Sequence, residues 1–164
     1  MYRIGQSKDI HRLAEGRKLV IGTVEIPFEK GSVAHSDGDA LVHAIVEAII
    51  GAMGKGDIGK LYPDTDNKYK DISSSYFLTN VKSLLEQNNY EICNIDSTVV
   101  IEKPMLAKII PEMKKNISNY LQISEDKINI KATRGEGLGY VGASEGYEAY
   151  AIVLLKNKNN LKKL

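Results

Sequence analysis

The chain has 164 residues, 43% of them hydrophobic, a size and composition that predict one compact domain with its own core. Its 22 basic and 21 acidic residues nearly cancel, so no overall field favours a nucleic acid or an anionic membrane as partner. The single cysteine, Cys93, excludes an intrachain disulfide and a multi-cysteine zinc cluster, so a bound metal would use histidine and carboxylate ligands.

The first third of the chain predicts strands followed by a helix. It opens without an apolar signal core, and no apolar run reaches the roughly 18 residues of a membrane span, so we expect a soluble, cytoplasmic protein. Residues Tyr2 to Ile10 are predicted as a strand and residues 18–27 as a hairpin. The loop after residue 27 leads to a helix from Asp37 to Met53, with Ser36 as its N-cap.

The remaining segments alternate between helix and strand. A helix is expected from Ile72 to Gln87, with Asp71 as its cap, and residues 90–101 then read as a strand. Pro111 opens a third helix, and Ile128 to Thr133 form another strand. Interleaved elements with a strand last predict an α+β or α/β domain whose single sheet is backed by helices.

The helix that ends at Met53 carries more apolar surface than one buried stripe requires. Val42, Val46 and Ile50 form a second apolar strip beside the main one, and His43 lies within it. Because a monomer buries one stripe against its sheet, this second strip predicts a subunit interface or a closed site.

Two glycine-rich motifs resemble nucleotide-binding loops but lack their context. "GKGDIGK" (residues 54–60) has the Gly-x-x-x-x-Gly-Lys spacing, but Leu61 stands where a phosphate-binding loop needs Ser or Thr for Mg²⁺. A helix precedes it, so Gly51 and Gly54 are predicted as helix stop signals. "GLGYVG" (residues 137–142) has Gly-x-Gly-x-x-Gly spacing, but residues 145–155 alternate as a strand where a dinucleotide fold needs a helix.

The three histidines provide the candidate metal ligands. Asp9 and His11 are two positions apart on a predicted strand, so their side chains leave the same face. If its helix packs over the end of that strand, His43 would be a third ligand, which leaves a tetrahedral Zn²⁺ one open position. The alternative is that His43 is a satisfied core histidine, which is common on an apolar helix.

Polar residues near the start of the first helix suggest a phosphate site. His35 and Ser36 precede a helix N-terminus, where free N–H groups favour an anion. The alternative reading is that Ser36, Asp37 and Asp39 only cap the helix. Downstream, "GDIGKLYPDTD" (residues 56–66) adds more polar groups in a loop, although turn chemistry alone explains its "PDTD".

Five segments in this order resemble one known family. They are "DIH" (9–11), "AHSDGDALVHA" (34–44), "GDIGKLYPDTD" (56–66), "EKPMLAKIIPEM" (102–113) and "KATRGEGLGY" (131–140). From Tyr2 to about Leu155 the chain resembles the 2-C-methyl-D-erythritol 2,4-cyclodiphosphate synthases. The resemblance implies a synthase-like domain over residues 1–157 and a basic tail at 158–164. It also implies an α+β fold with one mixed sheet backed by helices, assembled as a homotrimer with active sites between subunits.

The same resemblance implies an activity and a site. The reaction converts 4-diphosphocytidyl-2-C-methyl-D-erythritol 2-phosphate into the 2,4-cyclodiphosphate and CMP. Asp9, His11 and His43 would bind Zn²⁺, and Glu136 would bind Mg²⁺ or Mn²⁺. His35 and Arg134 would be the catalytic residues. The residues expected to bind the cytidyl diphosphate substrate are Ser36, Asp57, Ile58, Gly59, Tyr62, Asp64, Asp66, Ile101, Met105, Leu106, Ala107, Ala132, Thr133 and Tyr140.

Three positions depart from the family pattern. Arg134 replaces a Thr whose hydroxyl is taken to stabilise the transition state, and Met105 replaces a common Lys. Ala143 replaces an Arg that helps some members to hold an isoprenoid diphosphate on the trimer axis, so that ligand is not expected. Two alternatives to the synthase remain: a catalytically impaired trimer that binds zinc and cytidine nucleotides, and another metal-assisted phosphohydrolase.

Overall fold

A five-stranded mixed sheet forms the centre of the computed structural model, which describes residues 1–62 and 72–158. The strand order is β4-β1-β7-β5-β6. Only β5 and β6 run parallel, and the other neighbours are antiparallel. The strands are β1 (Tyr2–Glu15), β4 (Lys30–Val33), β5 (Tyr90–Val100), β6 (Ile128–Thr133) and β7 (Gly146–Asn157). The mixed α+β fold expected from the sequence is thereby confirmed.

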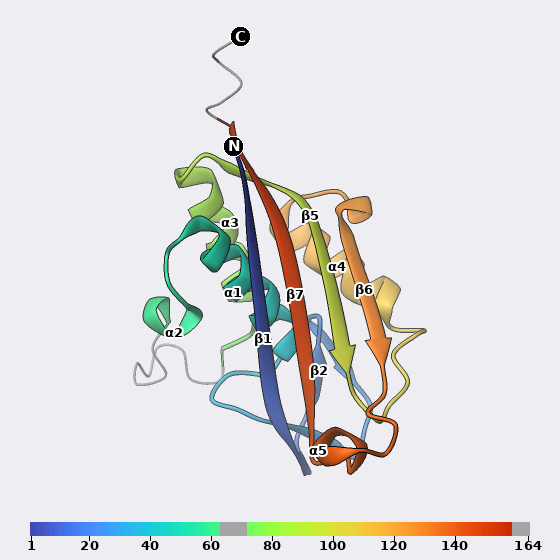
Figure 1. The fold of residues 1–164 in the computed structure, drawn as a ribbon. Helices are drawn as coiled ribbons and strands as arrows, with labels where there is room; N and C mark the ends of the chain where they lie inside the picture. Colours follow the sequence, from blue (N-terminus) through green and yellow to red (C-terminus); the bar gives the residue numbers. More distant parts are fainter. Residues whose placement is uncertain (63–71, 159–164) are drawn as a thin grey trace.

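Helices cover one face of the sheet, and the other face is open (Figure 1). The three long helices are α1 (Ala40–Met53), α3 (Ser75–Gln87) and α4 (Ile110–Leu121). α1 packs on β1 and β7, α3 on β5 and α4 on β6. The short elements are the hairpin β2 (Leu19–Ile21) with β3 (Val24–Ile26), the helices α2 (Ile58–Leu61) and α5 (Gly139–Gly142), and the 3₁₀ turn η2 (Glu125–Lys127). No helix in the described part of the chain is long and apolar enough to cross a membrane.

The two faces of the sheet follow from the alternation of side chains along its strands. In β7, Tyr147 and Val153 are fully buried under the helices, whereas Tyr150 and Ile152 lie on the open face. Residues 145–155 therefore form mainly a strand, as predicted. The glycine-rich segment before them forms only the short α5, which confirms that no dinucleotide-binding unit is present there.

The first helix is buried within a single chain. Val42, Val46 and Ile50 have no exposed surface, because α1 contacts α3 and β5 in addition to β1 and β7. The second apolar strip therefore needs no partner subunit, and the prediction of an interface along it was wrong. His43, in the same strip, does line a cavity.

Several predicted boundaries move in the structure. The N-cap of α1 is Asp39 and not Ser36, because the Asp39 side chain accepts the Val42 N–H. Gly54 ends the helix in the left-handed conformation, as predicted, whereas Gly51 lies inside it.

The strand that begins at Tyr2 continues to Glu15, because its last four residues pair with β4, a segment predicted as a loop. α3 begins at Ser75, three residues later than predicted, and its predicted cap Asp71 lies outside the described residues.

Candidate active site

The three predicted zinc ligands meet where α1 crosses β1. Asp9 and His11 lie on the helix-facing side of β1, and His43 projects toward them from α1. Asp9 Oδ2 lies 3.1 Å from His11 Nε2 and 3.1 Å from His43 Nδ1. The three ligand atoms lie within 4.8 Å of one another, which is the spacing of groups that share one ion.

A hydrogen-bonded layer behind the triad orients His43. Its Nε2 lies 3.1 Å from the hydroxyl oxygen of Ser74. Ser74 donates its hydroxyl to Asp37, and the Ser74 backbone N–H donates to the same carboxylate at 2.7 Å. Because the Ser74 oxygen is left to accept, the proton of a neutral His43 belongs on Nε2, and the Nδ1 lone pair faces Asp9.

Ser74 was not predicted from the sequence. It is one of three consecutive serines at the start of a helix, a pattern that indicates only capping. No sequence signal connects it to His43, which lies 31 residues earlier.

The electrostatics of the triad fit a cation. Burial opposes ionisation of Asp9, but hydrogen bonds and charge from His11 and His43 outweigh it and hold the pKa of Asp9 well below its usual range. Burial alone would lower the pKa of His43, but Asp9 raises it above its usual value. His11 Nε2 is buried beside the Asp9 carboxylate. Two imidazole nitrogens and one carboxylate are a donor set that suits Zn²⁺.

A cavity of about 220 Å³ opens beside the triad. Five residues predicted for the site line it together with the triad: His35, Ser36, Ile58, Gly59 and Tyr62. His35 Nε2 is buried and makes no hydrogen bond to a described residue. A molecule bound in this cavity would therefore contact both the His35 imidazole and the Asp9–His11–His43 triad.

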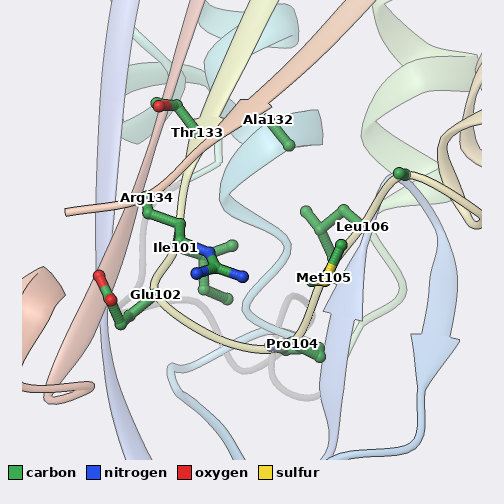
Figure 2. Close-up of a pocket in the computed structure, with 9 residues that line it drawn as sticks. Ile101, Glu102, Pro104, Met105, Leu106, Ala132, Thr133 and Arg134 are labelled. Atoms are coloured by element: carbon green, nitrogen blue, oxygen red, sulfur yellow. The ribbon is translucent and has the colours of Figure 1, made fainter. Parts of the chain in front are cut away.

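A second pocket, of about 150 Å³, lies at the adjacent ends of β5 and β6 (Figure 2). The two chain segments are tied together by the Ile101 N–H, which donates to the Thr133 carbonyl at 3.0 Å. Seven predicted residues line the pocket: Ile101, Met105, Leu106, Ala107, Ala132, Thr133 and Arg134. Glu102 and Pro104 line it as well. A small planar group fits a pocket of this size and largely apolar lining.

Comparison with known proteins settles the relationship of the chain. The model of the YgbB family matches residues 2–156. The chain belongs to the YgbB family. A 2-C-methyl-D-erythritol 2,4-cyclodiphosphate synthase of Caldicellulosiruptor bescii is 53% identical over 155 residues, which are 94% of this chain and 99% of the relative. The synthase of Geobacillus sp. (strain WCH70) is 50% identical over 158 residues, covering 96% of this chain and 100% of its own.

Solved structures of YgbB relatives have the same fold. The CDP complex of IspF from Plasmodium falciparum has a TM-score of 0.85 at 37% identity and covers 96% of this chain and 97% of its own. The bifunctional IspDF of Campylobacter jejuni has a TM-score of 0.91 at 39% identity. That match covers 96% of this chain, which spans 42% of the Campylobacter protein.

Other described residues predicted from the YgbB resemblance do not line the triad cavity. Asp57 caps α2, where its carboxylate accepts the Lys60 N–H at 2.7 Å. Glu136 follows β6 with a φ of 55°, and the Tyr140 hydroxyl donates to Glu148. The two acidic residues Asp64 and Asp66 lie outside the described residues.

Asp39 holds the triad-bearing helix of this YgbB chain in place. Its Oδ1 accepts the N–H groups of Gly22 at 2.9 Å and Val42 at 3.1 Å, and its Oδ2 accepts that of Thr23 at 2.6 Å. Burial raises the pKa of Asp39 to about 6, against the Thr23, Val42 and Gly22 N–H groups, which favour the ionised form. One carboxylate therefore ties the β2–β3 hairpin to the N-terminus of α1.

Replacing Asp39 with alanine is expected to lower the free energy of unfolding by about 3 kcal/mol, because three backbone N–H groups lose their acceptor. Asp39→Asn should lose less, since its amide oxygen can still accept two of them. Urea unfolding at pH 7 measures both. The control is Glu25→Ala, which removes an exposed carboxylate paired with Lys18 and should change stability by less than about 1 kcal/mol. Equal losses in Asp39→Ala and the control would contradict this role.

Proposed function

We propose that this protein converts 4-diphosphocytidyl-2-C-methyl-D-erythritol 2-phosphate into 2-C-methyl-D-erythritol 2,4-cyclodiphosphate and CMP. This makes it a lyase of the non-mevalonate route to isoprenoid precursors. The observation that carries the proposal is the near full-length match, at 50% identity and above, to proteins named as this synthase. The Asp-His-His triad beside a cavity agrees with it.

The reaction is an intramolecular phosphoryl transfer. An oxygen of the 2-phosphate attacks the β-phosphorus, the bond from that phosphorus to the oxygen of the cytidyl phosphate breaks, and CMP leaves with the electron pair. Because nucleophile and target belong to one molecule, the site contributes mainly by holding the substrate folded and by neutralising phosphate charge.

The residues of the triad cavity would hold the phosphorylated end of the substrate. Asp9, His11 and His43 would bind Zn²⁺, and Glu136 would bind Mg²⁺ or Mn²⁺. When bound, such ions neutralise phosphate oxygens and fix their positions. His35 would donate a hydrogen bond to the reacting phosphate from its ring. This role is supported by His35 Nε2, which is buried and makes no hydrogen bond with any described residue.

Further positions would orient the rest of the substrate. Ser36 and the backbone around Ile58 and Gly59 would hold the methylerythritol phosphate, with Asp57 fixing that turn by capping α2. Tyr62 would close the cavity on one side. Asp64, Asp66 and Tyr140 complete the proposed set of substrate-binding residues.

The pocket between β5 and β6 would hold the cytidine. Leu106, Ala132 and Ile101 give it apolar walls, and the segment 101–107 offers backbone groups to the edge of a base. The solved CDP complex of the Plasmodium falciparum relative supports a cytidine nucleotide as ligand.

We further propose that the protein is a cytoplasmic homotrimer with active sites between subunits. The open face of the sheet supports an assembly, because Ile4, Ile10, Tyr150 and Ile152 are exposed on it. Large apolar side chains exposed together on one face are typical of a protein interface. The helical layer covers only the other face (Figure 1).

Ile152→Lys is expected to convert the trimer into single chains. Ile152 is 47% exposed and pairs across the sheet with Gln6 and Asp96, so lysine fits the isolated chain but brings a charge into the interface. Size-exclusion chromatography with light scattering measures the change. Tyr120→Lys is the matched control, because Tyr120 is 40% exposed on α4, away from the open face. An unchanged mass for Ile152→Lys would contradict assembly through this face.

Phosphorus NMR of the purified protein with the cytidyl substrate, Zn²⁺ and Mg²⁺ tests the activity. Paired cyclic-diphosphate signals with equimolar CMP are expected. CMP with an uncyclised diphosphate would instead indicate a phosphohydrolase that activates water. Unaltered substrate, bound tightly by a folded, metal-loaded protein, would indicate a nucleotide-binding protein without synthase activity.

A further inference from the structure

Arg134 points into the pocket at the ends of β5 and β6. It directly follows β6, and Figure 2 shows its guanidinium directed into the hollow bordered by Ile101 and Met105. The residue is exposed, so its charged group remains accessible to solvent and to a ligand. The guanidinium makes no hydrogen bond or ion pair with any residue in the described ranges 1–62 and 72–158.

Among the described residues, the one carboxylate that lines this pocket is already engaged. Glu102 Oε2 accepts the backbone N–H of Gly135 at 3.0 Å, which holds the turn after Arg134 in place. Figure 2 shows the carboxylate of Glu102 away from the guanidinium. The free charge of Arg134 is therefore not needed for the local fold.

The pocket has an apolar part and a single cationic part. Among the described residues that line it, Arg134 carries the only positive charge. Glu102 is acidic, Thr133 is polar and the other lining residues are apolar. A nucleotide has a matching division, because its base is planar and weakly polar while its phosphates are anionic. A guanidinium presents parallel N–H donors that match two phosphate oxygens.

We propose that Arg134 anchors the diphosphate next to the nucleoside and makes this pocket selective for charged cytidine nucleotides over cytidine. The inference rests on the proposed function for the identity of the base. It assigns Arg134 to substrate binding, in contrast to the catalytic role that the family resemblance implied. Since the contact to the cytidyl phosphates is equally available before and during the reaction, Arg134 acts mainly on KM and less on kcat.

Calorimetric titration of the full chain with CDP and with cytidine, at constant Mg²⁺, tests the selectivity. Arg134→Thr is expected to weaken CDP binding by about 10- to 100-fold, the range of a charge-assisted contact, and cytidine binding by less than about twofold. Arg134→Lys keeps the positive charge but loses the two parallel N–H donors. Its CDP affinity should therefore lie between those of the wild type and of Arg134→Thr. Lys82→Thr removes one positive charge from α3, outside the pocket, and is the control for a general charge effect.

Each other result overturns the inference. If Arg134→Thr weakened the binding of cytidine and of CDP equally, the guanidinium would contact the nucleoside. If the variant bound CDP as tightly as the wild type, the guanidinium would remain in solvent. A wild-type chain that binds no CDP would also reject it. The synthase assay separates this inference from the proposed function. In an active enzyme, Arg134→Thr should raise KM about tenfold with kcat within about threefold. A chain that binds CDP through Arg134 but forms no cyclic product would reject only the synthase function.

Discussion

Replacing His43 by alanine is expected to lower synthase activity by at least about 10³-fold, because the proposed zinc site loses one of three protein ligands. The remaining pair, Asp9 and His11, would hold an ion much less tightly. The chain should stay folded, since the residue lies at the edge of a cavity and not inside the core. Product formation followed by phosphorus NMR and zinc content measured by mass spectrometry check the two halves of this expectation.

Ser74→Ala provides a graded comparison for His43→Ala. It keeps all three ligands and removes only the hydroxyl that lies 3.1 Å from His43 Nε2. Loss of such an orienting partner is expected to reduce metal affinity or activity by about 10- to 100-fold. A His43→Ala protein with unchanged zinc content would contradict the ligand assignment. A Ser74→Ala protein as impaired as His43→Ala would mean that the serine has a larger role than orientation.

The triad could be predicted from the sequence because each step depends on a local rule. Alternation along a strand places Asp9 and His11 on one face, and the helical period places His43 on the buried side of α1. The family resemblance supplied the pairing of these segments. The three side chains then meet within hydrogen-bonding distance, as expected.

The predictions that were wrong depend on contacts between segments far apart in sequence. β4 was placed in a loop because its four residues gain their strand conformation by pairing with the last four residues of β1. The apolar strip of Val42 and Val46 was assigned to an interface because the sequence does not show that α3 and β5 also cover α1. The Asp39 carboxylate, which caps α1 through the Val42 N–H, is also held by the N–H groups of Gly22 and Thr23 in the β2–β3 hairpin, a contact that the sequence does not show.

Of the substitutions proposed for this chain, Gly5→Ala is expected to lower the free energy of unfolding the most. A methyl group on residue 5 would lie 1.9 Å from the carbonyl oxygen of Ala48 and 2.7 Å from the Ala52 N–H nitrogen. Both contacts are with backbone of α1, so no side-chain rotation relieves them. β1 is held between β4 and β7 and cannot move away alone. Overpacking of this kind should cost about 3 kcal/mol or more, measured as the shift in free energy of unfolding in urea.

The same close approach sets the geometry of the triad. Since Gly5 and Ala48 allow α1 to lie directly on β1, His43 on the helix reaches Asp9 on the strand at 3.1 Å. Any Gly5→Ala protein that folds should therefore bind zinc more weakly than the wild type, as α1 is displaced from the strand. Gly51→Ala is the matched control. Gly51 lies inside α1 with open space around its Cβ position, so alanine there should stabilise the chain by about 0.5–1 kcal/mol and leave zinc binding unchanged. Equal stability of the two variants would show that the helix and the strand can separate freely, and the triad geometry would then need another cause.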